Sequence, residues 1–280
     1  MRVLIAGRGW MAVRTARLLA GLVAASDLDV RLEVVRNRND TGEQSWLPSL
    51  VAFAVARDWP IHERAEQASL GPGDLLISLQ HDRIVDCTRL GGASAYNLHF
   101  AYLPHYRGSL TSALPIRHGE TQVGVTLHVL VAAVDSGPVI AQRAFEIPPF
   151  CAAYDLYRLY HAYGFELLKE HLEALLSGDV AAVPQDDAAA TTFFRSAIDF
   201  ADADLRDFDR TATEVRDWLR SLIFPPSQYP TFRARKIEGC YALNWSSMKP
   251  EPPGTVIHEE PDLVIVACRE GLVGVEFLPA

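Results

Sequence analysis

The 280-residue sequence lacks the features of several common classes of protein. No stretch approaches the ~18 uncharged apolar residues of a membrane span, so no transmembrane helix is expected. The apolar run at the amino terminus is short, and Arg14 and Arg17 interrupt the next one, so we expect no secretory signal. The net charge of −9 argues against binding nucleic acid or an anionic membrane through bulk charge.

Cysteine and the signature motifs of other enzyme classes are also scarce. The four cysteines lie far apart without a CxxC pair, which fits neither a zinc ribbon nor a disulfide framework. No His/Cys/carboxylate spacing supports a metal site. The GxSxG, HExxH and GxxxxGKS/T motifs are absent, so no protein nucleophile elbow, zinc peptidase site or phosphate loop is predicted. Scattered buried thiols in a reducing cytoplasm are the expectation.

The sequence does contain the material for a sizeable core, because 49% of its residues are hydrophobic and 22% are charged. Its first 80 residues alternate between short apolar runs and helical periodicity. This pattern predicts strands at 3–6, 28–35 and 74–79, and helices at 12–22 and 47–57. Strand–helix alternation of this kind indicates an α/β fold, with a Rossmann-like, mostly parallel sheet.

The rest of the sequence predicts the end of this domain and a smaller carboxyl-terminal module. The larger domain is expected to continue with strands at 123–131 and 138–145 and a long helix at 155–176. Residues 180–192 are rich in Ala, Asp and Thr without periodicity, which is typical of a linker. A capping box at Thr211–Glu214 then opens a helix, and short β-like segments follow to residue 278. We therefore expect a larger domain over 1–190 and a helix-plus-β module over 191–280, of barrel-like form.

The turn after the first predicted strand invites a dinucleotide-binding interpretation. Gly7 and Gly9 match the start of the GxGxxG fingerprint, and Ala12 occupies its third glycine position. The acidic residue expected at the end of the second strand is missing, because Arg36 and Asn37 stand there. A nicotinamide site is therefore disfavoured. The alternative is a tight turn that leaves a helix amino terminus open to some anion.

A sharper chemical pattern lies in the middle of the chain. Asn97 and His99 are two residues apart on a predicted strand, so their side chains point to the same face. An amide and an imidazole can donate hydrogen bonds to a developing oxyanion, and the imidazole can accept a proton near neutral pH. The carboxylate of Asp135, in a Ser-Gly-Pro loop context, can hold the imidazole protonated or relay the proton. This set predicts direct attack on a carbonyl without a protein nucleophile.

The residues around this set carry a family resemblance. Residues 97–108 read NLHFAYLPHYRG, residues 124–128 read GVTLH, and residues 135–140 read DSGPVI. Together they resemble the formyltransferases that use N10-formyltetrahydrofolate as formyl donor. The resemblance implies the formyltransferase fold and a catalytic set of Asn97, His99 and Asp135. In this family the substrate amine attacks the formyl carbon, Asn97 and His99 would stabilise the oxyanion, and His99 with Asp135 would manage the proton.

The resemblance also implies where the folate binds. The segment from Ser78 to Ile84 matches the pterin pocket of the family, and residues near the catalytic strand would line the same cleft. The implied folate-binding residues are Leu79, Gln80, His81, Arg83, Ile84, Leu103 and Pro104. The sequence departs from the family after His99, where Phe100, Ala101 and Tyr102 replace the usual residues, and this departure concerns the acceptor pocket.

Members of this family formylate different amines, so the acceptor is predicted from the members that the sequence resembles most. The carboxyl-terminal module argues against the shorter purine enzyme, and the negative charge weighs against initiator tRNA. The stretches 119–142 and 220–226 are similar to formyltransferases of nucleotide-linked amino sugars. The resemblance thus implies a 3- or 4-amino sugar as substrate, a place in lipopolysaccharide O-antigen synthesis and a homodimer. The alternatives are methionyl-tRNA, hydroxyornithine or another small amine, or an inactive folate- or nucleotide-binding homologue.

Three residues are the candidate acceptor contacts. Trp10, after the first strand, is placed either to stack on a ligand or to pack over the turn. Tyr102 stands beside the catalytic strand, where the sequence departs from the family. Arg107 could pair with a diphosphate or brace a loop, and both interpretations stay open. His128 is expected in the core or behind the catalytic groups.

Overall fold

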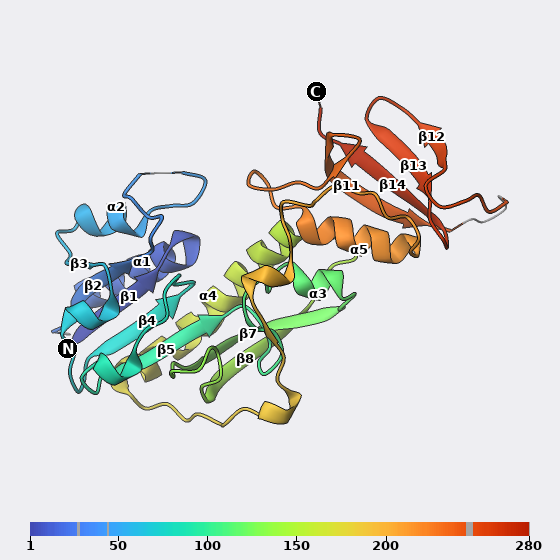
Figure 1. The fold of residues 1–280 in the computed structure, drawn as a ribbon. Helices are drawn as coiled ribbons and strands as arrows, with labels where there is room; N and C mark the ends of the chain where they lie inside the picture. Colours follow the sequence, from blue (N-terminus) through green and yellow to red (C-terminus); the bar gives the residue numbers. More distant parts are fainter. Residues whose placement is uncertain (27–28, 44, 245–248, 280) are drawn as a thin grey trace. The chain divides into compact units, whose positions relative to one another are not determined.

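The computed structural model describes residues 1–26, 29–43, 45–244 and 249–279 (Figure 1). Leu28, with which the predicted second strand begins, lies outside the described residues. The chain forms two compact units. The first unit comprises Met1–Gly108, Gly124–Ala144 and Tyr160–Thr192, and the second comprises Ser109–Val123, Phe145–Leu159 and Phe193–Ala280. Among the helices in these ranges, none is both long and apolar enough to cross a membrane.

The first unit is built around a seven-stranded sheet with the strand order β3-β2-β1-β4-β5-β7-β8. The neighbours from β3 to β5 pair in parallel, and β7 runs antiparallel to β5. The expected mostly parallel sheet is therefore confirmed. The strands are β1 (Arg2–Gly7), β2 (Arg31–Arg36), β3 (Ile61–His62), β4 (Leu75–Leu79), β5 (Ser94–His99), β7 (Gln122–Val129) and β8 (Val139–Glu146).

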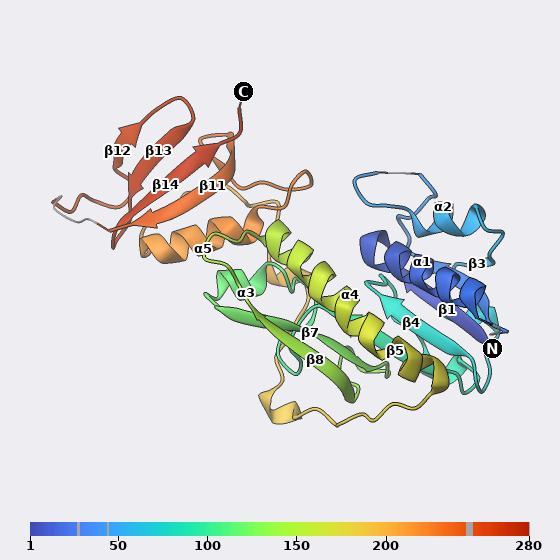
Figure 2. The same ribbon diagram turned by 180° about the vertical axis from the view of Figure 1, so that it is seen from behind.

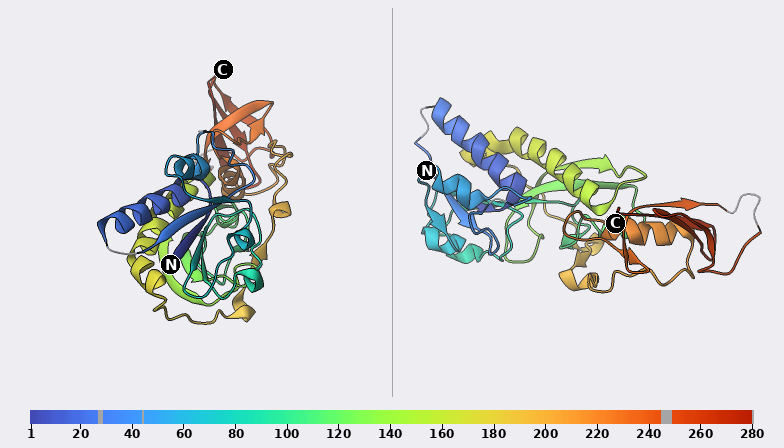
Figure 3. Two further views of the ribbon diagram at one scale, coloured as in Figure 1. Left: turned by 90° about the vertical axis from the view of Figure 1, so that its left-hand side faces the viewer. Right: turned by 90° about the horizontal axis from the view of Figure 1, so that it is seen from above.

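The helices α1 (Gly9–Ala25) and α4 (Ala153–Ser177) cover one face of this sheet (Figures 2 and 3). Gly164 of α4 allows the close approach, because a Cβ there would lie 3.1 Å from the Leu98 side chain and 3.3 Å from that of Met11. Phe100, just after β5, stacks on Tyr160 with ring centroids 5.3 Å apart. The stacking of Phe100 on Tyr160 thus fixes the end of β5 against α4.

The predicted helix at 47–57 is shorter in the structure, where α2 spans Leu50–Val55. Its start is set by two side chains that accept the first free N–H groups. The Ser49 hydroxyl accepts from the Ala52 N–H at 2.9 Å, and the Asp40 carboxylate accepts from the Leu50 N–H at 2.8 Å. These caps begin the helix after Pro48, because the residues before a cap are not helical.

The second unit holds a five-stranded sheet in the order β10-β11-β14-β13-β12. Its paired strands are antiparallel, and the two ends of the order are not paired with each other in the described residues. The sheet is therefore open, and the barrel-like expectation is corrected. Its strands are β10 (Thr231–Phe232), β11 (Arg235–Leu243), β12 (Val256–Glu259), β13 (Leu263–Ala267) and β14 (Leu272–Phe277).

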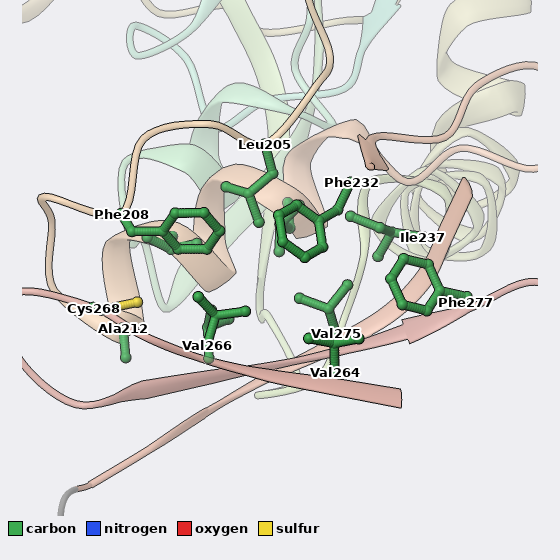
Figure 4. Close-up of a cluster of buried hydrophobic side chains, with 13 residues drawn as sticks. Leu205, Phe208, Ala212, Phe232, Ile237, Val264, Val266, Cys268, Val275 and Phe277 are labelled. Atoms are coloured by element: carbon green, nitrogen blue, oxygen red, sulfur yellow. The ribbon is translucent and has the colours of Figure 1, made fainter. Parts of the chain in front are cut away.

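Helix α5 (Ala212–Leu222) packs on this sheet over a hydrophobic core (Figure 4). Phe208 and Phe232 meet edge to face with centroids 5.6 Å apart, above the valines of β13 and β14. The predicted capping box is present at the start of α5. The remaining short elements are β6 (Arg107–Gly108), β9 (Thr192–Phe193), α3 (Leu114–Arg117), η1 (Ala65–Ala68), η2 (Cys87–Arg89), η3 (Asp187–Ala189) and η4 (Arg195–Ala197).

Candidate active site

The three residues predicted as the catalytic set lie together in the first unit. Asn97 and His99 are at the carboxyl end of β5, and Asp135 is in the loop between β7 and β8. The Asn97 amide Nδ2 donates to Asp135 Oδ1 at 3.2 Å, and His99 Nδ1 lies 3.4 Å from Asp135 Oδ2. The carboxyl end of a sheet strand is where open α/β folds build their sites.

His99 is 7% exposed, and its two ring nitrogens have different partners. Nε2 donates to the Tyr106 carbonyl at 2.9 Å, so Nε2 carries the proton of the neutral ring and Nδ1 keeps its lone pair. Burial lowers the pKa of His99 below its ordinary value, against the opposing effect of Asp135. The neutral ring can therefore accept a proton on Nδ1, where the carboxylate of Asp135 would stabilise the new charge.

Asp135 is held as a carboxylate. Burial alone would raise its pKa, but the nearby His99 and His128 rings and the Gly108 N–H outweigh this effect and lower the pKa to about 2. The Gly108 N–H donates to Oδ2 at 2.8 Å. The Asp135 backbone is left-handed, with φ of 48°, which is uncommon for a residue with a side chain.

His128 is buried against Asn97 and Asp135, which is the position behind the catalytic groups that the sequence indicated. It lies on β7, directly opposite Asn97 in the pairing with β5. Its Nδ1 donates to the Val129 carbonyl at 2.9 Å, which leaves the Nε2 lone pair to accept from Asn97 Nδ2 at 3.0 Å. Nε2 also lies 3.5 Å from Asp135 Oδ1. Both amide hydrogens of Asn97 therefore have protein acceptors.

The predicted folate-binding residues at the end of β4 and just after it lie beside the catalytic strand, because β4 pairs with β5. Leu79 is buried, Gln80 has a left-handed backbone with φ of 57°, and Ile84 is 74% exposed. His81 Nδ1 lies 2.8 Å from Asn37 Oδ1, and burial lowers the pKa of His81 to about 4. Arg83 faces Glu63 at 3.5 Å. Their role in folate binding stays a prediction.

Asn37 is a residue whose importance the sequence did not reveal. It is fully buried at the end of β2, where only the missing acidic residue had been noted. Its Nδ2 donates to the Gln80 carbonyl at 3.0 Å, and its Oδ1 faces His81. Asn37 thus holds the loop after β4 in place.

Leu103 and Pro104, on the other predicted side of the folate cleft, are also firmly positioned. The Leu103 N–H donates to the hydroxyl of buried Thr126 at 3.1 Å, and Gln142 Nε2 donates to the Leu103 carbonyl at 2.7 Å. The segment after His99 is therefore fixed by side chains of β7 and β8.

The acceptor candidates divide into two kinds. Trp10 is 52% exposed on the first turn of α1, and Tyr102 is 43% exposed. A Cβ on Gly124 would lie 2.6 Å from the Tyr102 ring, so the ring rests on that glycine. Arg107 is buried, and its guanidinium donates to Gln185 at 2.8 and 3.1 Å and to Asp187 at 2.7 Å. Arg107 thus braces a loop, and its contact with a diphosphate stays a prediction.

Comparison with known proteins places this geometry in context. Residues 85–172 match the model of the formyl transferase family. The chain is 32% identical over 236 residues to the methionyl-tRNA formyltransferase of Myxococcus xanthus, an alignment that covers 80% of this chain and 73% of that protein. It is 31% identical over 179 residues to the Sorangium cellulosum methionyl-tRNA formyltransferase, covering 63% of this chain and 57% of that one.

Two solved structures are similar over the whole chain. WlaRD, a sugar 3-N-formyltransferase crystallised with dTDP and 5-N-formyltetrahydrofolate, has a TM-score of 0.88 and 26% identity, covering 100% of this chain and 98% of that one. A Helicobacter canadensis N-formyltransferase, in complex with folinic acid and dTDP-3-aminofucose, has a TM-score of 0.86 and 26% identity, covering 99% of each chain. Since similarity to formyltransferases extends over most of the chain, the protein belongs to the formyltransferase family, as its sequence resemblance predicted.

Proposed function

We propose that this formyltransferase moves the formyl group of N10-formyltetrahydrofolate to the primary amine of a nucleotide-linked amino sugar, with a dTDP-linked 3-amino sugar as the first choice. The observation that carries the proposal is the similarity to WlaRD, which extends through both units with a TM-score of 0.88. In the proposal, residues 1–190 bind the folate and perform the transfer. Residues 191–280 form the smaller module, and the enzyme works as a cytoplasmic homodimer.

The residues of the first unit fit a formyl folate. The expected pterin loop offers the fixed backbone of residues 79–84, and buried Leu79 and Leu103 supply apolar contact. When bound, the folate supplies the electrophilic formyl carbon. His99 Nδ1 would take the proton that the attacking amine loses, and Asp135 would stabilise the resulting imidazolium. The imidazolium would return this proton to N10 of the tetrahydrofolate as the bond between N10 and the formyl carbon breaks. Asn97 would donate to the oxyanion by exchanging one of its present bonds, to His128 or to Asp135, for one to the substrate.

Methionyl-tRNA is the second candidate acceptor, because the Myxococcus xanthus relative that is 32% identical over 236 residues is a methionyl-tRNA formyltransferase. A tRNA substrate needs a surface that neutralises many phosphates. The net charge of −9 weighs against such a surface on this chain.

An acceptor screen tests the proposal. Tetrahydrofolate release would be followed with dTDP-linked 3- and 4-amino sugars, hydroxyornithine and charged initiator tRNA, with wild-type enzyme and the His99→Ala variant. We expect turnover of a dTDP-amino sugar and its loss in the variant by at least 100-fold. Turnover of tRNA alone would replace the sugar by the second candidate. If formyl folate neither binds nor reacts, the proposed transfer itself is wrong.

A further inference from the structure

A segment that the sequence indicates only as a linker crosses the catalytic loops. We call residues 183–191 the strap; it follows helix α4, which ends at Ser177. At its start, the Val139 N–H donates to the Val183 carbonyl at 2.7 Å, and the Val183 N–H donates back at 2.8 Å. The strap is therefore fixed to the beginning of β8, directly after the loop that carries Asp135.

Gln185 is the central contact between the strap and that loop. Its Nε2 donates to the backbone carbonyls of Asp135 at 2.8 Å and Gly137 at 2.7 Å. Its Oε1 accepts two hydrogen bonds from the guanidinium of Arg107. One side chain thus uses both amide hydrogens and its oxygen to join the Asp135 loop to the loop of residues 104–108.

The other end of the strap holds the loop that orients His99. The Thr191 hydroxyl accepts from the Tyr106 N–H at 2.8 Å, and the Thr191 carbonyl accepts from the Arg107 N–H at 2.8 Å. The Tyr106 carbonyl is the acceptor for His99 Nε2. The strap therefore contacts both loops that act on His99. One supplies the Tyr106 carbonyl, which sets the tautomer of the ring, and the other carries Asp135, the carboxylate that faces Nδ1.

Both loops contain a strained residue at the point where the strap holds them. Asp135 has φ of 48° and Tyr106 has φ of 58°, in the left-handed region that costs energy for residues with a side chain. Such conformations persist only where surrounding contacts over-determine them. The bond that Gln185 donates to the Asp135 carbonyl and the bond that Thr191 accepts from the Tyr106 N–H supply those contacts.

We propose that Gln185 is a positioning residue for formyl transfer, which aligns Asp135 with His99 by holding the backbone of the 135–137 loop. The proposal rests on the proposed function only for its kinetic readout. The strap's contacts predict a loss of catalytic alignment, without a loss of fold, when the two amide donors of Gln185 are removed.

The test compares two variants with a matched control. Gln185→Glu keeps the size of the side chain and an acceptor for Arg107, but it places an oxygen in front of two carbonyls. Gln185→Ala removes all four bonds. Asp186→Ala is the control, because the hydrogen bond that the neighbouring Asp186 carboxylate makes with the described residues is a local one, accepted from the Ala188 N–H. We expect both Gln185 variants to lower kcat on the order of 10–100-fold with the KM for formyl folate unchanged.

A second readout does not depend on the acceptor. Asp135 raises the pKa of His99 against the effects of burial and of His128, so a displaced Asp135 should move the NMR titration of the His99 ring to lower pH. We expect this shift in both Gln185 variants and not in Asp186→Ala. Unchanged kcat and an unchanged His99 titration would overturn the proposal, as would a parallel loss of kcat, folate affinity and melting temperature. An inactive wild type with the shifted titration would count against the proposed function alone.

Discussion

Asn97 has a fixed orientation in this site because both neighbours of its amide, His128 and Asp135, accept hydrogen bonds from it. His128 donates through Nδ1 to the Val129 carbonyl, so its Nε2 can only accept while the ring is neutral. The Asn97 amide nitrogen must therefore face His128 and Asp135, and its oxygen must point away from them. The orientation of a proposed oxyanion donor is thus set by a buried imidazole outside the predicted catalytic set.

Replacing His128 should therefore impair catalysis rather than binding. In His128→Phe the ring fills the space but accepts no hydrogen bond from Asn97, and we expect kcat to fall about 10–100-fold, a cost similar to losing other positioning contacts. In His128→Gln a side-chain oxygen can accept in its place, so the loss should be smaller. Steady-state kinetics at saturating folate measure both effects.

Val125→Ala is the control for His128, because Val125 is also buried on β7. It should lower stability through lost packing and leave kcat nearly unchanged. Equal kcat values in the two His128 variants, or the same fall in Val125→Ala, would contradict a specific role for the imidazole.

The sequence predicts which side chains share a face of one strand, but it does not predict which side chains meet across neighbouring strands. Asn97 and His99 share a face because they are two apart on β5, which the sequence alone indicates. His128 meets Asn97 only through the antiparallel register of β5 with β7. Asn37 reaches the loop after β4 across the sheet in the same way. Register and cross-sheet contacts depend on the assembled fold, and no local period encodes them.

Among the elements, helix α5 has the start most clearly written in the sequence. The Thr211 hydroxyl accepts from the Glu214 N–H at 3.2 Å, and the Glu214 carboxylate accepts from the Thr211 N–H at 2.8 Å. We expect Thr211→Ala to lower the free energy of unfolding by about 1 kcal/mol, since the helix loses its cap. Urea denaturation of the purified protein measures this change.

Thr213→Ala is the matched control for the cap, because Thr213 is exposed two residues further along the same helix. Alanine has the higher helix propensity there, so this variant should be neutral or slightly more stable. A cost in Thr213→Ala as large as that in Thr211→Ala would show that the capping box is not the cause.

The closure of the carboxyl-terminal sheet was less predictable than its strands. Alternating apolar residues and Gly or Pro turns indicate strands, but whether the first and last strands pair depends on how far the sheet coils. The observed order leaves β10 and β12 as the two edges of the sheet. Helix α5, together with Phe208 and Phe232, contributes to the hydrophobic core of this sheet. The helix takes the place of further strands in burying the inner face.

For the whole molecule, the two units interleave along the chain. Composition marks a change near residue 190, but 109–123 and 145–159 belong with the carboxyl-terminal residues. These segments flank β7 and β8, and the second of them begins helix α4. A composition shift detects a linker but not a chain that leaves one unit and returns to it.

Stability of the whole protein should fall as the medium becomes acidic. Burial lowers the pKa of His81 and of His161 to about 4, and that of His99 below its ordinary value of 6.5. Between pH 6.5 and 4 the unfolded chain therefore binds protons that the folded protein excludes, which favours unfolding. Asp135, with a pKa of about 2, adds a further loss only below pH 3.8.

Melting temperatures between pH 7.5 and 4.5 measure this dependence. We expect a steady decrease below pH 6.5 and little change between pH 7.5 and 6.5. His161→Phe, which removes one of the buried imidazoles, should show a shallower decrease. A melting temperature that stays constant down to pH 5 would mean that these rings titrate normally in the folded protein.

The position of the strap in the chain has a consequence for biosynthesis. A ribosome completes all seven strands of the first unit's sheet and the whole of α4 before it adds residues 183–191. A chain that ends prematurely in between carries Asn97, His99 and Asp135 but none of the strap's hydrogen bonds. With the proposed role of Gln185, the order of synthesis would delay alignment of the site until residues 193–280 are about to be added, so an unfinished enzyme would be poorly equipped to consume formyl folate.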